Sequence, residues 1–323
     1  MKAAVHTSYG PPEVVRVVDV PAPVPTDDQV LVKVHATTVN RTDCGFRAAK
    51  PWLVRPFSGL LRPRRTILGN EFAGEVTAVG RAVTSFAAGD RVFGYDDSAW
   101  GAHAEYLVIR QDASLARIPA ELTYQEAAPA TEGSHYALAN IDKAGIRAGQ
   151  RVLVNGATGA IGSAAVQLLA SRGVHVTAVC GTAHVELVRR LGAERVIGRG
   201  REDFTRDTQT YDVVFDAVGK SSFGRCRHLL GPRGVYLSTE LGPRGQNPFL
   251  ALVTPLLPGR SVRFPLPRHD QAMINQLRDL MESGQFRPVV DRSYPLADIV
   301  EAYRYVETGQ KIGNVVITMP HAG

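Results

Sequence analysis

Residues 151–162 read Arg-Val-Leu-Val-Asn-Gly-Ala-Thr-Gly-Ala-Ile-Gly, and this stretch decides the fold of the middle of the chain. The apolar run at 152–154 is typical of a strand buried on both faces, and apolar residues recur at helical spacing over 164–169. A strand, a glycine-rich turn and a helix in this order can cradle a pyrophosphate, because small residues let phosphate approach the free N–H groups of the helix. The alternative is a tight turn that needs glycine for steric reasons alone.

Four further apolar runs follow, separated by polar turns and helical patterns. They span residues 174–180, 195–197, 211–218 and 234–238. Alternating strands and helices predict a doubly wound parallel sheet over residues 126–267. In that setting the glycine stretch is interpreted as a dinucleotide-binding loop rather than a plain turn.

The first 125 residues show a different pattern, in which short alternating β segments are separated by turn residues. The clearest of them span residues 29–36, 74–80, 89–94 and 104–108. This spacing predicts an antiparallel, barrel-like domain. Helices over 271–283 and 296–307 and a strand over 314–319 are expected to return to it. The expected fold class is therefore α/β, with a barrel-type domain at 1–125 and 268–323 around a nucleotide-binding domain at 126–267.

Composition narrows the class of protein. The 323 residues are 44% hydrophobic and 21% charged, which suits two globular domains. No apolar run reaches 18 residues, and the first six residues lack an apolar stretch, so neither a membrane span nor a signal peptide is expected. Cys44, Cys180 and Cys226 are too few and too far apart for a disulfide framework or a cysteine-rich zinc site. We expect a cytoplasmic protein.

The net charge of +6 comes from 31 arginines against 6 lysines, and these are scattered along the chain. A nucleic-acid-binding surface would concentrate positive charge on one face of a recognisable module. Only the stretch 55–65 is denser, and it is broken by proline and glycine. The charge is interpreted as solvated surface that helps to recruit an anionic cofactor, and no nucleic-acid partner is expected.

The end of the second buried strand predicts which cofactor binds. Sites for NAD usually place an acidic residue there, whereas residues 180–184 read Cys-Gly-Thr-Ala-His. A 2′-phosphate would not be repelled, so NADPH is expected. Thr182 can donate a hydrogen bond, and His184, Arg199 or Arg189 can supply positive charge. For Arg189 the favoured interpretation is a solvated helix face.

Several motifs together carry a family resemblance. They are Asn-Arg-Thr-Asp at 40–43, Leu-Gly-Asn-Glu-Phe-Ala-Gly at 68–74, Gly-Asp-Arg-Val-Phe-Gly at 89–94, residues 155–162, and Phe-Asp-Ala-Val-Gly at 215–219. From Met1 to Met319 the chain resembles the zinc-independent, quinone oxidoreductase-like (zeta-crystallin-type) branch of the medium-chain dehydrogenase/reductases. The resemblance implies a GroES-like catalytic domain, a Rossmann domain, an active site in the cleft between them, and a homodimer formed edge to edge by the Rossmann sheets.

The departures from zinc-dependent relatives are also informative. Those relatives place a cysteine where Asn40 stands and a His-Glu pair where Asn70 and Glu71 stand, and their third ligand falls near Ala130. A neutral asparagine is a poor substitute for a thiolate or an imidazole. No catalytic metal is therefore expected, and alcohol oxidation through a zinc alkoxide is not expected either.

The resemblance implies hydride transfer from NADPH to a small acceptor that is already activated, either a quinone or a C=C bond conjugated to a carbonyl. By the same resemblance the Asn40 amide serves the acceptor oxygen and Ser134 faces the nicotinamide. His135 is a candidate proton donor, although an isolated histidine at an apolar helix start is more often structural. Contacts to the cofactor are expected from Gly156, Ala157, Thr158, Gly159, Ala160, Ile161, Gly162, Val218 and Asn314. The alternatives are a zinc-free carbonyl or alcohol oxidoreductase, and a non-catalytic NADPH-binding scaffold or sensor.

Overall fold

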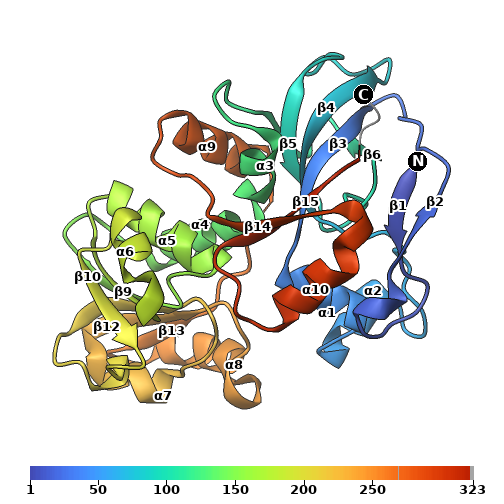
Figure 1. The fold of residues 1–323 in the computed structure, drawn as a ribbon. Coiled ribbons are helices and arrows are strands. Elements are labelled where there is room, and N and C mark those ends of the chain that lie inside the picture. The colour runs from blue at the N-terminus through green and yellow to red at the C-terminus, as the bar shows by residue number, and fades with distance from the viewer. Residues whose placement is uncertain (268, 321–323) are drawn as a thin grey trace. The chain divides into compact units, whose positions relative to one another are not determined.

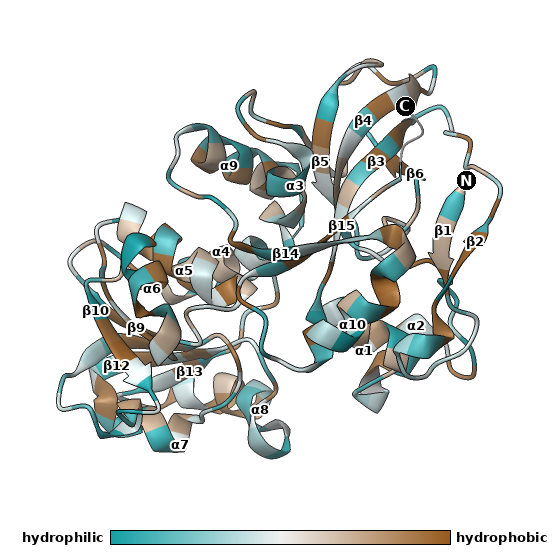
Figure 2. Cartoon of the chain, in the orientation of Figure 1, coloured by the Kyte–Doolittle hydropathy of each residue, from teal (hydrophilic) through white to brown (hydrophobic). Residues whose placement is uncertain are grey.

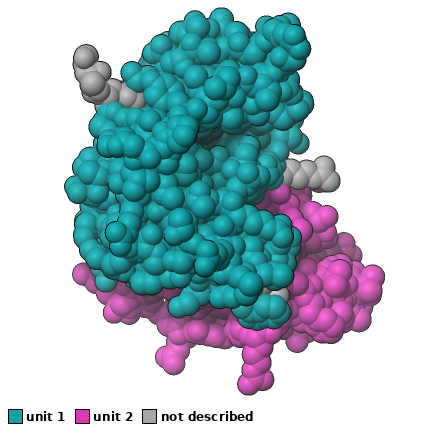
Figure 3. Space-filling view, turned by 90° about the vertical axis from the view of Figure 1, so that its right-hand side faces the viewer, with its two compact units in different colours: residues 1–132, 269–283, 287–323 teal, residues 133–268, 284–286 magenta. Residues whose placement is uncertain are grey.

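The computed structural model describes residues 1–267 and 269–320, and the chain divides into two compact units (Figures 1 and 3). Unit 1 comprises residues 1–132, 269–283 and 287–323, and unit 2 comprises residues 133–268 and 284–286. Unit 1 extends past the expected limit at residue 125. The reason is that helix α3 (Tyr124–Ala127) and the 3₁₀ turn η3 (Ala128–Ala130) pack against strands of the unit 1 sheet.

Unit 1 is built on a seven-stranded sheet in the order β14-β15-β3-β4-β5-β7, with β6 also paired to β3. Its strands are β3 (Gln29–Val39), β4 (Glu71–Val79), β5 (Arg91–Tyr95), β6 (Tyr106–Arg110), β7 (Ser114–Arg117), β14 (Val290–Pro295) and β15 (Asn314–Thr318). All the pairs are antiparallel except β14 with β15. A separate hairpin joins β1 (Lys2–Val5) and β2 (Arg16–Asp19). The C-terminal strand β15 pairs with β3, so it belongs to the sheet of unit 1.

Strand β3 anchors the core of unit 1. Val30, Val32 and Val34 are fully buried, whereas Leu31 and Lys33 between them are only partly buried. This is the alternation that the sequence predicts for a strand with one buried face. The strand ends at Val39, and Asn40 is the next residue. The sheet therefore fixes the position of the Asn40 backbone.

Three helices of unit 1 have bounds that the sequence predicts only in part. Helix α9 (Gln271–Glu282) is close to the expected range, and α10 (Ile299–Glu307) begins three residues later than expected, after the 3₁₀ turn η9 (Leu296–Asp298). Helix α1 (Arg41–Ala48) was not expected. Asn40 caps it: the side chain accepts from the Asp43 N–H, and the Asp43 carboxylate accepts from the Asn40 N–H, a reciprocal capping box.

Unit 2 contains the expected parallel sheet, in the order β10-β9-β8-β11-β12-β13. Its strands are β8 (Arg151–Asn155), β9 (His175–Gly181), β10 (Arg195–Arg199), β11 (Tyr211–Asp216), β12 (Leu230–Ser238) and β13 (Ser261–Arg263). Its helices are α4 (Glu132–Ala144), α5 (Ala160–Ser171), α6 (Val185–Arg190), α7 (Phe223–Cys226) and α8 (Gln246–Val253). The central strands β8, β9 and β11 are almost fully buried, as expected for strands covered on both faces, and Figure 2 shows brown, apolar stretches in β9 and β10. Among the described residues no helix is both long and apolar enough to cross a membrane.

Candidate active site and cofactor loop

The three glycines of the loop between β8 and α5 have different structural requirements. Gly156 has φ +84°, and a Cβ there would lie 2.3 Å from Val218 Cγ1. A Cβ on Gly162 would lie 2.1 Å from the Gly156 oxygen. The protein itself needs glycine at both positions. For Gly159 the nearest described atom to a Cβ is the Gly156 oxygen at 3.6 Å, so steric need within the chain does not explain this glycine.

The start of helix α5 suits an anion. Gly159 is its N-cap, and no side chain among the described residues caps it. The first N–H groups of a helix lack partners within it and carry the positive end of its dipole. Thr158, Gly159, Ala160 and Ile161 are partly exposed there. The loop therefore fits a pyrophosphate, with Gly159 as the point of closest approach.

Two of the expected loop residues act differently from their neighbours. Ala157 and Gly162 are buried, so they shape the backbone and present no side chain to a ligand. Val218 follows β11 and lies against Gly156, so the structure places it beside the glycine loop, and its contact with the cofactor stays a prediction. Asn314 lies in unit 1, where its side-chain amide donates to the Val289 carbonyl at 3.1 Å. The structure gives this side chain a structural partner within unit 1, and its contact with the cofactor stays a prediction.

Ser134 and His135 lie in the first turn of α4, 1% and 2% exposed. A Cβ on the preceding Gly133 would lie 2.7 Å from the carbonyl carbon of Ala160, so the start of α4 packs on the start of α5. The His135 ring is 4.6 Å from that of Tyr136. Ser134 thus stands beside the glycine loop, whereas the burial of His135 supports a structural role for this residue. The close approach of Gly133 was not predicted.

The expected residues for the 2′-phosphate converge at the ends of β9 and β10. Arg199 pairs in register with Gly181, and a Cβ on Gly198 would lie 2.9 Å from Thr182 Cγ2. His184 closes the same 3₁₀ turn, η4 (Thr182–His184). Arg189 instead pairs with Glu186 on the exposed face of α6 at 2.7 Å, in agreement with the interpretation as a solvated helix residue.

Arg199 also lines a cavity of about 440 Å³ at this edge of the unit 2 sheet. Three more cations line it, namely Arg201, Lys220 and Arg225, against the acids Glu202 and Asp203. Positive charge therefore exceeds negative charge at the carboxyl ends of the strands. Sequence reasoning did not name Lys220 or Arg225, although both follow β11, the neighbour of β8 in the same sheet.

In unit 1, Asn40 and Asn70 occupy the positions where zinc-dependent relatives have ligands, and both are buried. The Asn40 amide donates to Asn70 Oδ1 at 2.7 Å, and the Asn70 amide donates to Glu132 Oε2 at 3.1 Å. These polar groups thus satisfy one another. Within the described part of the chain, no group of three or more histidine, cysteine, aspartate or glutamate side chains could hold a metal ion.

Glu71 and Glu132 form a buried pair of carboxyl groups beside the two asparagines. Glu71 accepts from the Thr38 hydroxyl at 2.6 Å, from the Thr131 hydroxyl at 2.8 Å and from the Glu132 N–H at 2.8 Å. Burial raises the pKa of Glu132 to about 7, and the nearby charge of Glu71 adds to the rise. Nothing in the local sequence marks either glutamate, because their partners lie on other elements of the fold.

Further buried titratable groups surround this cluster. Burial lowers the pKa of His103 to about 4, so its neutral ring bonds the Thr38 carbonyl at 2.7 Å. Burial also raises the pKa of Asp43 well above its ordinary value, although the N–H groups of Asn40 and Gly69 oppose the rise. Neither residue was predicted. His103 and Asp43 thus bind the backbone on both sides of the junction between β3 and α1, where Asn40 lies.

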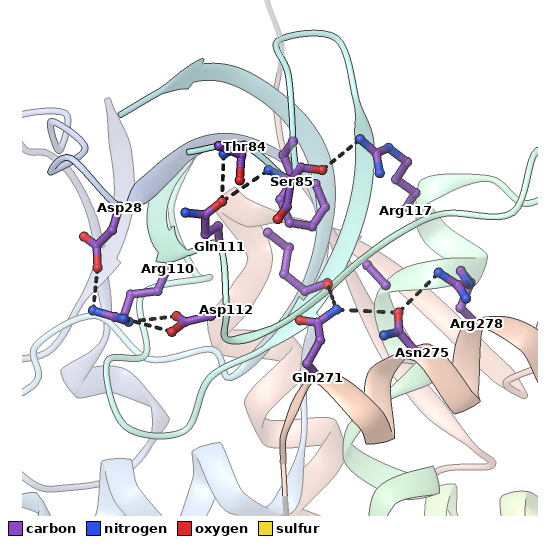
Figure 4. Close-up of a pocket in the computed structure, with 13 residues that line it drawn as sticks. Asp28, Thr84, Ser85, Arg110, Gln111, Asp112, Arg117, Gln271, Asn275 and Arg278 are labelled. Carbon is purple, nitrogen blue, oxygen red and sulfur yellow. Dashed lines mark hydrogen bonds and ion pairs between the residues drawn. The ribbon is translucent and has the colours of Figure 1, made fainter. Parts of the chain in front are cut away.

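Two sizeable cavities are lined by described residues of unit 1. One, of about 640 Å³, is lined by His6, Phe46, Pro56, Phe57, Ser58, Pro63, Arg64, Arg65, Leu68, Asp97, Ser98 and Trp100. The other, of about 520 Å³, lies beside β7 and α9 (Figure 4). Its cations are already paired, Arg110 with Asp28 at 2.5 Å and Arg117 with Asp90 at 2.7 Å. The larger cavity has Phe46, Phe57 and Trp100 in its wall, so it is the better candidate for a small organic acceptor.

Replacing Asn40 by alanine should have two separable effects. The cap of α1 is lost, which lowers the free energy of unfolding by about 1 kcal/mol. If the amide also serves the acceptor, turnover should fall about tenfold while the dissociation constant of the cofactor stays within twofold. Thr123→Ala is the matched control, because Thr123 caps α3 with the same reciprocal box. Equal loss of turnover in both variants would leave Asn40 with a structural role only.

Comparison with known proteins agrees with this arrangement. A family model described as an alcohol dehydrogenase GroES-like domain matches residues 26–120, and one described as a zinc-binding dehydrogenase matches residues 191–317. The 2-methylene-furan-3-one reductase of Solanum lycopersicum is 30% identical over 98% of this chain and 79% of its own length. The chloroplastic NADPH-dependent alkenal/one oxidoreductase of Arabidopsis thaliana shows the same identity and coverage.

A solved structure gives the same result for the whole fold. The quinone oxidoreductase from Coxiella burnetii superposes with a TM-score of 0.88 at 26% identity, over 99% of both chains. The motifs, the two compact units, the glycine loop and these relatives all point to one family. The chain belongs to the quinone oxidoreductase-like branch of the medium-chain dehydrogenase/reductase superfamily, and it is an oxidoreductase that binds a nicotinamide cofactor.

Proposed function

We propose that this enzyme uses NADPH to reduce a quinone or the C=C bond of an α,β-unsaturated carbonyl, without a metal ion. The observation that carries the proposal is the hydrogen-bonded set Asn40, Asn70 and Glu132 at the position where zinc-dependent relatives hold their metal. Acceptors that need no metal are those already activated for hydride addition. The names of the tomato and Arabidopsis relatives describe reductases of conjugated carbonyl compounds, which supports this class.

NADPH supplies the hydride when bound, and the residues of the chain bind and orient the reactants. The start of α5 would hold the pyrophosphate, and the cations around Arg199 would hold the 2′-phosphate. Asn40 has one amide hydrogen committed to Asn70 and a second with which it can serve an acceptor oxygen. The cavity of about 640 Å³, with Phe46, Phe57 and Trp100 in its wall, would take a flat conjugated acceptor.

Acceptor-dependent oxidation of NADPH tests the proposal. A panel of quinones and enones is mixed with the enzyme and NADPH, and the products are identified. We expect hydroquinones or saturated carbonyl compounds. An alcohol that retains its C=C bond would instead favour a zinc-free carbonyl reductase. Cofactor binding without turnover of any acceptor would favour an NADPH-binding scaffold or sensor.

Metal analysis tests the metal-free part of the proposal. We expect less than stoichiometric zinc in the purified protein and unchanged activity after treatment with a chelator. The reason is that neutral amides replace the thiolate and imidazole that zinc prefers. Activity that a chelator removes and zinc restores would contradict the metal-free mechanism.

We also propose a homodimer that acts in the cytoplasm on a small molecule, with no nucleic-acid or membrane partner. Three side chains at the edge of unit 2 near β13 support the dimer, because Phe249, Leu252 and Leu256 are 65%, 74% and 84% exposed. An apolar patch of this kind is typical of an interface. The double variant Phe249→Glu and Leu252→Glu should therefore sediment as a monomer, whereas a wild-type monomer would contradict the proposal.

The described cysteines are free and buried, which suits a reducing compartment.

A further inference from the structure

Tyr95, at the end of β5, lies between two carboxyl groups of unit 1. Its hydroxyl faces Asp97 Oδ2 at 3.5 Å and also bonds to the side chain of Glu132. Tyr95 is 2% exposed, so its hydroxyl is shielded from bulk water, whereas the Asp97 side chain reaches solvent. A tyrosine hydroxyl has a single proton to donate. When it donates to one carboxyl group, it can bond the other only by accepting a proton from it, so this geometry favours one extra proton shared by the three groups.

The row of polar groups continues to solvent at one end. Asp97 Oδ1 lies 3.2 Å from His269 Nε2, and both side chains are more than one third exposed. At the other end Glu132 is held by the Thr42 hydroxyl and the Asn70 amide. Asp97 also lines the cavity of about 640 Å³ that we assign to the acceptor. The buried carboxyl group, the tyrosine, the cavity-lining carboxyl group and the exposed imidazole therefore form one continuous path.

We propose that Asp97 is the proton donor to the reduced acceptor, and that Tyr95, Glu132 and His269 keep it supplied with protons. This inference rests on the proposed function, because it concerns the second half of that reaction. After hydride adds to the β carbon of an enone, the π electrons reside on the carbonyl oxygen as an enolate. The Asp97 O–H bond breaks, a Cα–H bond forms, and the Asp97 carboxylate regains a proton from solvent through His269 or from Glu132 through Tyr95.

The electrostatic surroundings favour a stored proton. Burial raises the pKa of Glu132 to about 7, and the charges of Glu71 and Asp97 add to the rise. The Glu132 charge in turn adds to the rise in the pKa of Asp43 on α1, which burial causes in the first place. Burial raises the pKa of Asp97 as well, with Asp96 adding to the rise and His269 opposing it. Since a raised carboxyl pKa means that the proton stays bound to higher pH, Glu132 holds its proton below about pH 7 and loses it above.

The stereochemistry of protonation gives a readout that a purely structural role would not change. An enone with an α-methyl group is reduced in D₂O, and the configuration at the deuterated α carbon is measured. We expect the wild type to give one enantiomer in excess. Asp97→Asn should lose that excess and at least tenfold in turnover, since general acid catalysis typically contributes more than this. Asp96→Asn is the matched control, because its side-chain oxygen can still accept from the Ser98 N–H. An unchanged excess and rate in Asp97→Asn would overturn the proposal.

Infrared spectroscopy of the resting enzyme tests the shared proton without turnover. The difference spectrum between wild type and Glu132→Gln should show the C=O band of a protonated carboxyl group that disappears as pH rises above about 7. Tyr95→Phe removes only the bridging hydroxyl and should shift this band. This second variant tests the relay even if the glutamine variant does not fold. Absence of the band overturns the relay whatever the activity. If the band is present but no enone or quinone is reduced, the proposed function fails and the proton storage stands.

Discussion

Gly159→Asp should abolish binding of the nicotinamide cofactor while leaving the protein as stable as before, or slightly more so. The two effects have opposite signs because the position is the N-cap of α5. Aspartate is among the preferred N-cap residues, and its charge complements the helix dipole. The same carboxylate would face the pyrophosphate, and two unit charges about 4 Å apart at a protein surface repel by roughly 4 kcal/mol, about a thousandfold in affinity.

Gly159→Asn is the control, because it adds nearly the same volume without charge. Quenching or enhancement of NADPH fluorescence measures affinity, and thermal unfolding measures stability. We expect Asn to weaken binding much less than Asp if charge dominates, and equally if the approach of phosphate is too close for any side chain. The space around Gly159 allows either variant to fold, whereas alanine at Gly156 or Gly162 would collide with Val218 or with backbone. Unchanged NADPH affinity in Gly159→Asp would show that the loop is only a turn.

The cofactor loop could be predicted from the sequence because its determinants are local. The buried run of β8, the glycines and the first turn of α5 all lie within residues 151–169, and their spacing alone predicts strand, turn and helix. The sequence does not separate the glycines by role. Only the structure shows that Gly156 and Gly162 avoid clashes inside the protein, whereas Gly159 leaves space for a ligand.

Helix α1 escaped prediction for a physical reason. Residues 41–48 carry four polar side chains and Gly45, so no apolar stripe marks them as helical. The helix depends on the capping box between Asn40 and Asp43, and it packs against α10, more than 250 residues along the chain. The hydrogen bonds of Asn40 could not be predicted for the same reason. Its amide does lie in the catalytic domain, but one hydrogen is committed to Asn70, a partner that no local pattern reveals.

The proposed proton path shows the limit of sequence reasoning more sharply. Tyr95, Asp97, Glu132 and His269 come from a strand end, a loop, a helix start and a segment beyond unit 2. No motif joins them, and each residue type is common on protein surfaces. Their joint role depends on burial, which raises the carboxyl pKa values, and on a single hydroxyl placed between two acids. Both are properties of the folded chain.

Arg199→Ala should weaken NADPH binding about ten- to a hundredfold and leave NADH binding nearly unchanged. Arg199 ends β10 beside Thr182 and lines the cation-rich cavity of unit 2, where a 2′-phosphate is expected. A charge-assisted contact to phosphate contributes roughly 1.5–3 kcal/mol, and every 1.4 kcal/mol is about tenfold in affinity. Only NADPH carries this phosphate, so only its affinity should fall.

Titration of both cofactors against wild type, Arg199→Ala and Arg189→Ala decides the question. Arg189 is the matched control, because it removes the same charge from the same unit while its guanidinium is paired with Glu186 on an exposed helix face. Its loss should change neither affinity. Equal losses for NADH and NADPH in Arg199→Ala would indicate structural damage, and a wild-type preference for NADH would contradict the assignment altogether. A loss well below tenfold would mean that Lys220 and Arg225, which line the same cavity, carry the phosphate instead. The double variant Lys220→Ala and Arg225→Ala would then show the selective loss of NADPH affinity.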